Sequence, residues 1–198
     1  MLVNKYKACK TDNSLSSHYL EVYDYHFSKL RLLPLEICEI GVQRGGSLKM
    51  WADYFPNAQI TGIDIKKKCK KHESQRIKII IGDQADKKFL VKLGNFDIII
   101  DDGGHTMTQQ KTSLKYLWDH LNKGGIYVIE DLETSYWPRF GGGYGREKTT
   151  IQKLKSYIDS LNCMAIDHSR AEKYKQKIKN LNIKSMHFYP SMCFLYKR

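Results

Sequence analysis

Short apolar runs alternate along the chain with stretches whose apolar residues recur at helical spacing. Runs of four to eight Ile-, Val- and Phe-rich residues bounded by Gly, Asp or Pro are typical of strands, whereas apolar residues three and four positions apart predict amphipathic helices. Strands that alternate with helices predict an α/β fold with a parallel sheet. The predicted strands are residues 35–42, 59–65, 77–81, 95–101, 125–129, 183–189 and 192–197. The predicted helices are residues 18–33, 48–55, 87–93, the segment between 105 and 125, 149–161 and 169–180.

Residues 95–131 form the central unit, which consists of a strand, an amphipathic helix and a second strand. A βαβ unit places its two strands parallel, so both end at the same edge of the sheet. The first strand runs into Asp101-Asp102-Gly103-Gly104-His105 and the second into Glu130-Asp131. Open α/β sheets bind ligands at this edge. We therefore expect four carboxylates and a histidine to crowd together there.

Crowded carboxylates repel one another unless a cation or a proton compensates them. We interpret Asp102, Glu130 and Asp131 as ligands of Mg²⁺ or Mn²⁺, because carboxylate oxygens suit these ions and no His/Cys set suggests zinc. His105 follows Asp102 across a Gly-Gly pair, and a neutral histidine takes protons from hydroxyl groups near pH 7. Simpler interpretations stay open, in which the acids cap loops or helices and the histidine is structural.

The first three strand ends favour a nucleoside ligand. Gly41, Gly45 and Gly46 form a glycine loop that lets the backbone approach a ligand and that lacks the P-loop ending and the strict dinucleotide spacing. Asp64 ends the second strand, where an acid accepts both ribose hydroxyls. The third strand ends in Asp83-Gln84, an acceptor and an amide where an adenine edge would lie. An ordinary tight turn and a capping acid are the alternatives.

The chain is basic, and its sequence contains no recognisable nucleic-acid-binding motif or membrane-spanning segment. The 198 residues suffice for one domain with a full core, and Lys+Arg 33 against Asp+Glu 21 gives a formal net charge of +12. We interpret the scattered lysines as solvated surface, since no nucleic-acid-binding motif accompanies them. No run reaches the roughly 18 apolar residues of a membrane span. Five cysteines without metal-ligand spacing fit a reducing compartment, so we expect a cytoplasmic protein.

Taken in order, the motifs resemble those of class I S-adenosylmethionine-dependent methyltransferases. They are Glu-Ile-Gly, Gly-Gly-Ser-Leu-Lys-Met-Trp, Ile-Thr-Gly-Ile-Asp-Ile, Gly-Asp-Gln, Phe-Asp-Ile-Ile-Ile-Asp-Asp-Gly-Gly-His, Gly-Gly-Ile-Tyr-Val-Ile-Glu-Asp-Leu and Tyr-Trp-Pro-Arg-Phe-Gly-Gly. Over residues 10–197 the chain is similar to the metal-dependent sugar O-methyltransferases of macrolide biosynthesis, the macrocin and mycinamicin type, and to their cephalosporin-hydroxylase-like relatives. The resemblance implies one Rossmann-like methyltransferase domain, residues 34–198, preceded by a helical cap segment, residues 1–33. It also implies a seven-stranded, mostly parallel sheet with an antiparallel last strand and helices on both faces.

The resemblance implies a role for each matching residue. The residues expected around S-adenosylmethionine are Glu39, Gly41, Gly45 and Ser47 at its methionine part, Asp64 at the ribose, and Asp83 with Gln84 at the adenine. Tyr19 or Tyr23 of the first helix is expected to close over the cofactor. Asp102, Glu130 and Asp131 are expected to hold Mg²⁺, with His105 as the base. Asp101 either faces the cofactor or braces the loop. In the loop 132–147, the residues expected to meet the substrate are Tyr136, Trp137 and Phe140, which would stack on sugar rings, and Arg139 or Arg146, which would meet a phosphate.

These roles predict a Mg²⁺-dependent O-methyltransferase that acts on a hydroxyl of a sugar, glycan or glycosylated metabolite, without nucleic acid or membrane as a partner. Two alternatives stay open: a methyltransferase of RNA or a small phenol, and a cofactor-binding partner protein without catalysis. Aromatic residues exposed on the first helix would allow a homo-oligomer. The macrolide enzymes have an additional N-terminal domain, so their oligomer and acceptor pocket do not carry over. They also have a longer glycine loop, and similar enzymes often carry Ser where Gly104 stands.

Overall fold

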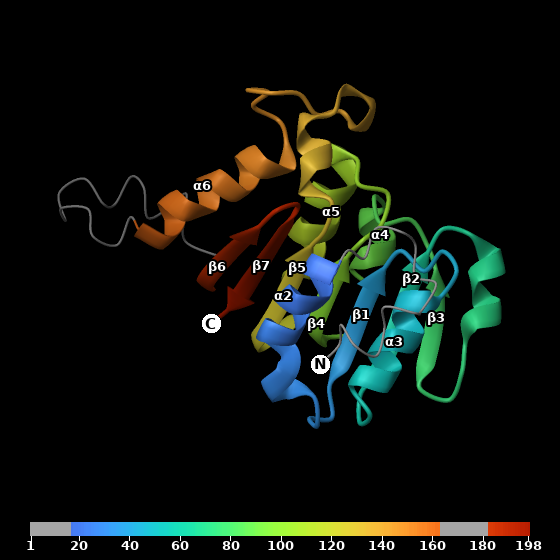
Figure 1. Ribbon diagram of the computed structural model, residues 1–198. Coiled ribbons are helices and arrows are strands. Elements are labelled where there is room, and N and C mark those ends of the chain that lie inside the picture. Colours follow the sequence, from blue (N-terminus) through green and yellow to red (C-terminus); the bar gives the residue numbers. More distant parts are fainter. Residues whose placement is uncertain (1–16, 163–181) are drawn as a thin grey trace.

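The computed structural model describes residues 17–162 and 182–198 (Figure 1). Its seven strands form one sheet in the order β3-β2-β1-β4-β5-β7-β6. The first five strands of the chain are parallel, and β7 is antiparallel to both β5 and β6. The strands are β1 (Glu36–Ile40), β2 (Gln59–Asp64), β3 (Ile77–Ile81), β4 (Phe96–Asp101), β5 (Leu121–Ile129), β6 (Ile183–Tyr189) and β7 (Met192–Lys197). The predicted fold class is therefore confirmed.

Helices cover both faces of the sheet, as Figure 1 shows. The α-helices are α2 (Ser17–Phe27), α3 (Gly46–Tyr54), α4 (Lys87–Leu90), α5 (Met107–Leu117) and α6 (Thr150–Asn162). The 3₁₀ helices are η1 (Ser28–Leu30), η2 (Lys67–His72), η3 (Leu132–Tyr136) and η4 (Pro138–Phe140). One hydrophobic core joins α2 and α3 to one face of the sheet, and a second core joins α4, α5 and α6 to the other.

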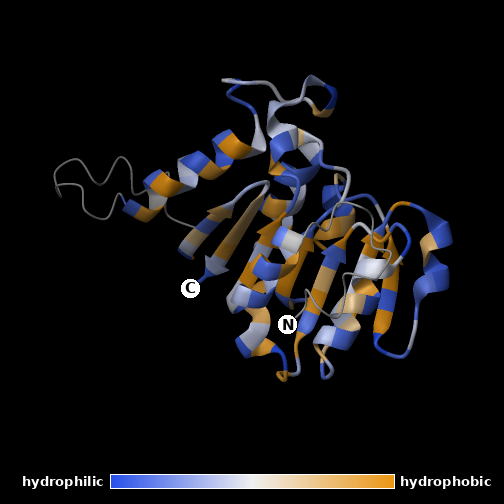
Figure 2. Ribbon diagram, in the orientation of Figure 1, coloured by the Kyte–Doolittle hydropathy of each residue, from blue (hydrophilic) through white to orange (hydrophobic). Residues whose placement is uncertain are grey.

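The strands are apolar along their whole length because both of their faces are buried. Ile37 packs in the α2–α3 core and its neighbour Cys38 packs in the opposite core, as the alternation of side chains in a strand requires. Figure 2 shows the hydrophobic residues concentrated on the strands, with hydrophilic residues on η2. None of the helices in the described ranges is long and apolar enough to cross a membrane.

Most sequence predictions match these elements, and the differences lie at their ends. The C-terminal hairpin has the predicted bounds, with Ser191 in a left-handed conformation at its turn. The first helix ends at Phe27 and continues as a 3₁₀ turn, and β5 begins four residues earlier than predicted, at Leu121. The long loop after β5 contains η3 and η4. The predicted helix 169–180 lies outside the described residues.

The first segment packs into the main core of the sheet. Tyr23 and Phe27 of α2 are fully buried beside Trp51 of α3 and Phe194 of β7. Helix α2 therefore covers one face of the sheet directly, and its Tyr19 reaches Asp131 at the end of β5. The division of the chain at residue 34 stays a prediction.

Candidate active site

A cavity of about 420 Å³ opens at the carboxyl edge of the parallel strands. This size suits a nucleoside-sized ligand, since small-molecule sites commonly span about 300 to 1,000 Å³. The predicted residues that line it are Gly41, Ser47, Asp64, Asp83, Gln84, Asp102, His105 and Asp131. The predicted residues outside its lining are Tyr19, Glu39, Gly45, Asp101, Glu130, Tyr136, Trp137, Arg139 and Phe140.

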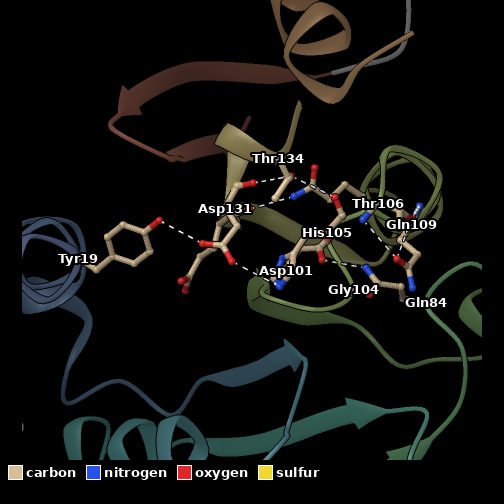
Figure 3. Close-up of polar contacts among 11 residues, drawn as sticks. Tyr19, Gln84, Asp101, Gly104, His105, Thr106, Gln109, Asp131 and Thr134 are labelled. Carbon is tan, nitrogen blue, oxygen red and sulfur yellow. Dashed lines mark hydrogen bonds and ion pairs between the residues drawn. The ribbon is translucent and has the colours of Figure 1, made fainter. Parts of the chain in front are cut away.

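Asp102, His105 and Asp131 converge at one end of this cavity. Each offers one ligand atom, and these three atoms lie within 4.8 Å of one another. The His105 Nε2 atom is 3.4 Å from Asp131 Oδ2 (Figure 3). His105 (φ 58°) and Asp131 (φ 53°) both adopt the left-handed conformation, which is uncommon outside glycine. These two local turns end the extended backbone and bring the side chains together.

The Thr134 hydroxyl links the two turns. Its oxygen lies 3.1 Å from the His105 carbonyl oxygen and 2.6 Å from the Asp131 carbonyl oxygen, so its single hydrogen is shared between two acceptors. This contact ties the loop after β4 to the loop after β5 (Figure 3). Thr134 is buried in η3 and carries no sequence motif that would have indicated this role.

Buried carboxylates surround this end of the cavity without a compensating cation. Burial, followed by the charges of Glu130 and Glu39, holds the pKa of Asp102 well above its usual range. Burial also raises the pKa of Glu130 to about 8, against the effect of a hydrogen bond donated by Tyr23. No Lys or Arg forms an ion pair with these acids in the described ranges. A divalent cation would stabilise the ionised forms of these acids, and their oxygen donors fit such a cation.

The predicted metal ligands differ in their placement. Asp102 and Asp131 lie in the three-residue group with His105. Glu130 is buried behind them, and one of its carboxylate oxygens accepts the hydroxyl of Tyr23. The assignment of Glu130 as a ligand stays a prediction.

Asp64 lies at the end of β2, beside the glycine loop. Its Oδ2 accepts the N–H groups of Val42 and Gln43, each at 3.0 Å, and its Oδ1 accepts the N–H of Lys66 at 2.8 Å. Burial alone would raise the pKa of Asp64. These backbone donors outweigh burial and hold that pKa below its usual value. Asp64 is therefore a fixed, ionised acceptor at the wall of the cavity.

Gly41 allows the first loop to approach the end of β4. Its φ is 99°, and a Cβ atom there would lie 2.1 Å from the Asp102 carbonyl oxygen. A side chain at this position would therefore push the glycine loop away from the acids. Gly45 (φ 71°) lies against the His72 ring instead of the cavity.

Gln84 and Asp101 brace the loop that carries His105. The Gln84 amide donates to Asp101 Oδ1 at 3.0 Å, and its oxygen accepts the Gly104 N–H at 2.7 Å. Asp101 is fully buried and also accepts the hydroxyls of Ser113 and Tyr127. Of the two roles predicted for Asp101, the structure shows the bracing contacts and places its side chain off the cavity wall.

Gln109 lines the cavity and was not predicted as a site residue. Its side-chain oxygen accepts the Thr106 hydroxyl at 2.7 Å, and the two residues form a capping box at the start of α5. The Thr-x-x-Gln spacing would have indicated this cap. A Cβ atom on Gly104 would lie 2.3 Å from the Gln109 amide, so Gln109 fills the place that a side chain at position 104 would need.

Aromatic residues of η3 and η4 lie beyond His105. The Phe140 ring centre is 6.4 Å from that of His105. The guanidinium of Arg139 lies 4.8 Å from the Trp137 ring centre and 4.9 Å from that of Phe140. Trp137 and Tyr136 are partly exposed, at 40% and 44%. We call Tyr136, Trp137, Arg139 and Phe140 the aromatic ledge.

Glu39 lies beneath the glycine loop and accepts hydrogen bonds from Ser47 and Trp51. Burial raises its pKa from 4.5 to about 8, although both hydrogen bonds oppose this shift. The folded state therefore binds the proton more tightly than the unfolded state does. The stability from this proton is fully present below pH 4.5 and is lost as the pH rises to about 8.

We expect Glu39→Gln to remove this part of the pH dependence. Between about pH 5 and pH 9, the free energy of unfolding of the ligand-free protein should fall by roughly 3 to 5 kcal/mol more in the wild type than in the variant. Urea denaturation at several pH values measures the difference in slope, and a constant offset between the proteins does not affect it. Parallel pH curves would show that Glu39 does not titrate in this range.

The fold and the cavity agree with those of a methyltransferase domain. A family model described as a methyltransferase domain matches residues 38–132. The order and direction of the strands, the acid at the end of β2 and the glycine loop after β1 agree with it.

More particularly, the chain is similar to sugar O-methyltransferases of antibiotic biosynthesis. The mycinamicin VI 2''-O-methyltransferase of Micromonospora griseorubida is 39% identical over 191 residues, which are 88% of this chain and 47% of that protein. The 8-demethyl-8-alpha-L-rhamnosyl tetracenomycin-C 2'-O-methyltransferase of Streptomyces olivaceus is 38% identical over 192 residues, 91% of this chain and 50% of that protein. The predicted resemblance is confirmed.

A solved structure shows the same similarity. The MycE methyltransferase from the mycinamycin pathway, in complex with Mg, SAH and mycinamycin VI, superposes with a TM-score of 0.84 and 36% identity. The match covers 99% of this chain and 52% of that chain. This chain thus spans about half the length of the relatives it matches.

Proposed function

We propose that this protein is a Mg²⁺-dependent O-methyltransferase that transfers the methyl group of S-adenosylmethionine to a sugar hydroxyl of a glycosylated small molecule. The observation that carries the proposal is the group of Asp102, His105 and Asp131, with ligand atoms within 4.8 Å of one another, at one end of a cavity lined by Asp64. This arrangement supports a cation site and a base beside a nucleoside site. The names of the relatives add the sugar hydroxyl as acceptor.

The residues at one end of the cavity bind and orient S-adenosylmethionine. Asp64 accepts the ribose hydroxyls with the lone pairs that its three backbone donors leave free, and Asp83 lies where the adenine would bind. Gly41 and Ser47 border the methionine part, and Glu39 supports Ser47 from below. S-adenosylmethionine supplies an electrophilic methyl group when bound. Fixed geometry of the acceptor and donor atoms then provides much of the rate, because both reactants are held in position.

The residues at the acid end prepare the acceptor hydroxyl. Asp102 and Asp131, with Glu130 behind them, would hold a divalent cation, which would lower the pKa of a hydroxyl group bound beside it. His105 takes the hydroxyl proton on Nε2, the nitrogen that faces Asp131. The backbone at His105 is held for this role by the Gln84 brace on Gly104 and by Thr134 on the His105 carbonyl.

The aromatic ledge is the proposed acceptor platform. Aromatic faces stack on the apolar faces of sugar rings, and the partly exposed Trp137 and Tyr136 present such faces. Trp137 packs on Phe140, whose ring lies next to that of His105. Arg139 lies over the Trp137 and Phe140 rings, and its guanidinium would donate hydrogen bonds to acceptor oxygens. Arg146 is exposed, and its guanidinium donates to the Gly142 carbonyl of the same loop at 3.1 Å.

Methyl transfer from isotopically labelled S-adenosylmethionine tests the proposed function. The acceptors are mycinamicin VI, demethylmacrocin and the rhamnosyl tetracenomycin substrate named for the relatives, with RNA and catechol as comparison acceptors. Label on a glycoside, and on neither comparison acceptor, is the expected result. Label on RNA or catechol alone would contradict the sugar assignment, and tight cofactor binding without transfer to any acceptor would favour a non-catalytic role.

A further inference from the structure

Two tyrosines of α2 reach the acids at the end of β5. The Tyr23 hydroxyl donates to Glu130 Oε1, and the Tyr19 hydroxyl donates to Asp131 Oδ1 at 3.4 Å. The two tyrosines are one helical turn apart, so they lie on the same face of α2. Figure 3 shows the Tyr19 side chain extending from α2 to Asp131. Both contacts join parts of the chain more than 100 residues apart, and neither tyrosine lines the cavity.

The surrounding core fixes the position of the Tyr23 hydroxyl. The residue is fully buried, and its ring packs edge-to-face on Trp51 at 4.8 Å and on Phe194 at 5.5 Å between ring centres. Phe27 packs against it at 5.3 Å. A ring enclosed in this way has no alternative rotamer without disrupting the core. The hydroxyl is therefore a rigid donor aimed at Glu130.

This donor occupies one of the two oxygens of Glu130. Among the described residues, Tyr23 is the one side chain that hydrogen-bonds to the Glu130 carboxylate. A hydrogen bond to one oxygen orients the carboxylate plane and leaves the other oxygen available. Outer partners of this kind commonly set the orientation of carboxylates that bind metal ions.

We propose that Tyr23 is a positioning residue that holds Glu130 in the orientation needed to bind the divalent cation. The inference rests on the proposed metal-dependent function and extends it to α2, which becomes part of the metal site. Tyr19 orients Asp131 in the same way, through a longer hydrogen bond. The expected closure of Tyr19 or Tyr23 over the cofactor stays a prediction.

Tyr54 provides a matched control for the removal of a buried tyrosine hydroxyl. Like Tyr23 it is buried in the α2–α3 core, and its hydroxyl donates to a carboxylate, Asp24 Oδ1, at 2.8 Å. Asp24 lies on α2 and not at the strand ends. Tyr54→Phe and Tyr23→Phe therefore remove the same group from the same core, and only Tyr23→Phe removes a contact to the acids.

Titration of the 198-residue chain with Mn²⁺ in a calorimeter tests the proposal. We expect Tyr23→Phe to bind Mn²⁺ about 10- to 100-fold more weakly than the wild type. Tyr54→Phe should bind Mn²⁺ as the wild type does. The affinity for S-adenosylmethionine should be the same in all three proteins, and circular dichroism in EDTA checks that each is folded.

Equal Mn²⁺ affinities for Tyr23→Phe and the wild type would overturn the inference alone. A loss of Mn²⁺ affinity in Tyr54→Phe as large as that in Tyr23→Phe would also overturn it, because it would indicate a general loosening of the core. A wild-type chain that binds no Mn²⁺ would overturn the inference together with the metal-dependent function. The failure of the two proposals is therefore distinguishable.

Discussion

Replacement of His105 by alanine is expected to lower the rate of methyl transfer by about 10² to 10⁴-fold, the usual contribution of a general base. The reason is geometric, because the imidazole faces the cavity beside Asp102 and Asp131. Binding of S-adenosylmethionine and of Mn²⁺ should persist, since Asp64 and the carboxylates are intact. Rates with saturating cofactor and metal, together with calorimetric titrations of both, measure these effects.

The exposed His187 of β6 provides the control, because it lies away from the cavity. His187→Ala should retain the wild-type rate. The group of three residues also admits another role for His105, as a metal ligand. A loss of Mn²⁺ affinity in His105→Ala as large as that in Asp102→Asn would assign it to the metal and contradict its role as the base.

Asp102→Asn is expected to abolish metal binding without unfolding the protein. The amide removes a ligand charge, so Mn²⁺ affinity should fall by at least about 100-fold, beyond the effect of removing an outer partner. In EDTA the variant should be at least as stable as the wild type, because the substitution relieves repulsion from Glu130 and Glu39. Mn²⁺ titration and thermal denaturation in EDTA give the two quantities.

The control for Asp102→Asn is Asp53→Asn, which changes an exposed carboxylate on α3 away from the cavity. It should leave both Mn²⁺ affinity and thermal stability unchanged. A variant Asp102→Asn that unfolds at a clearly lower temperature than the wild type in EDTA would show that this carboxylate stabilises the fold, and that its charge is compensated in the metal-free protein.

The sequence predicted the sheet and the edge at which the acids meet, because both depend on local patterns. Continuous apolar runs located the strands, and the parallel βαβ connection put the ends of β4 and β5 side by side. The alternation of side chains also limited what was predictable. Asp101 is the last residue of β4 and points into the buried network with Ser113, whereas Asp102 follows the strand and reaches the cavity.

Contacts between distant segments were not predictable from the sequence. The hydroxyl of Tyr23 meets Glu130 across 107 positions, and the aromatic spacing of α2 indicates only that the residue is buried. Gln84 lines the cavity, and its place at the adenine stays a prediction, whereas its hydrogen bonds to Gly104 and Asp101 were not predicted. Such choices depend on which partner the packed core brings within hydrogen-bonding distance, and no local pattern encodes them.

Removal and restoration of the metal test the central claim most directly. The wild-type chain is dialysed against EDTA, and methyl transfer to a glycosylated acceptor is then measured before and after addition of Mg²⁺. Loss of activity in EDTA and its recovery with Mg²⁺ is the predicted result. Full activity in EDTA would contradict the assignment of the Asp102 and Asp131 carboxylates to a catalytic cation.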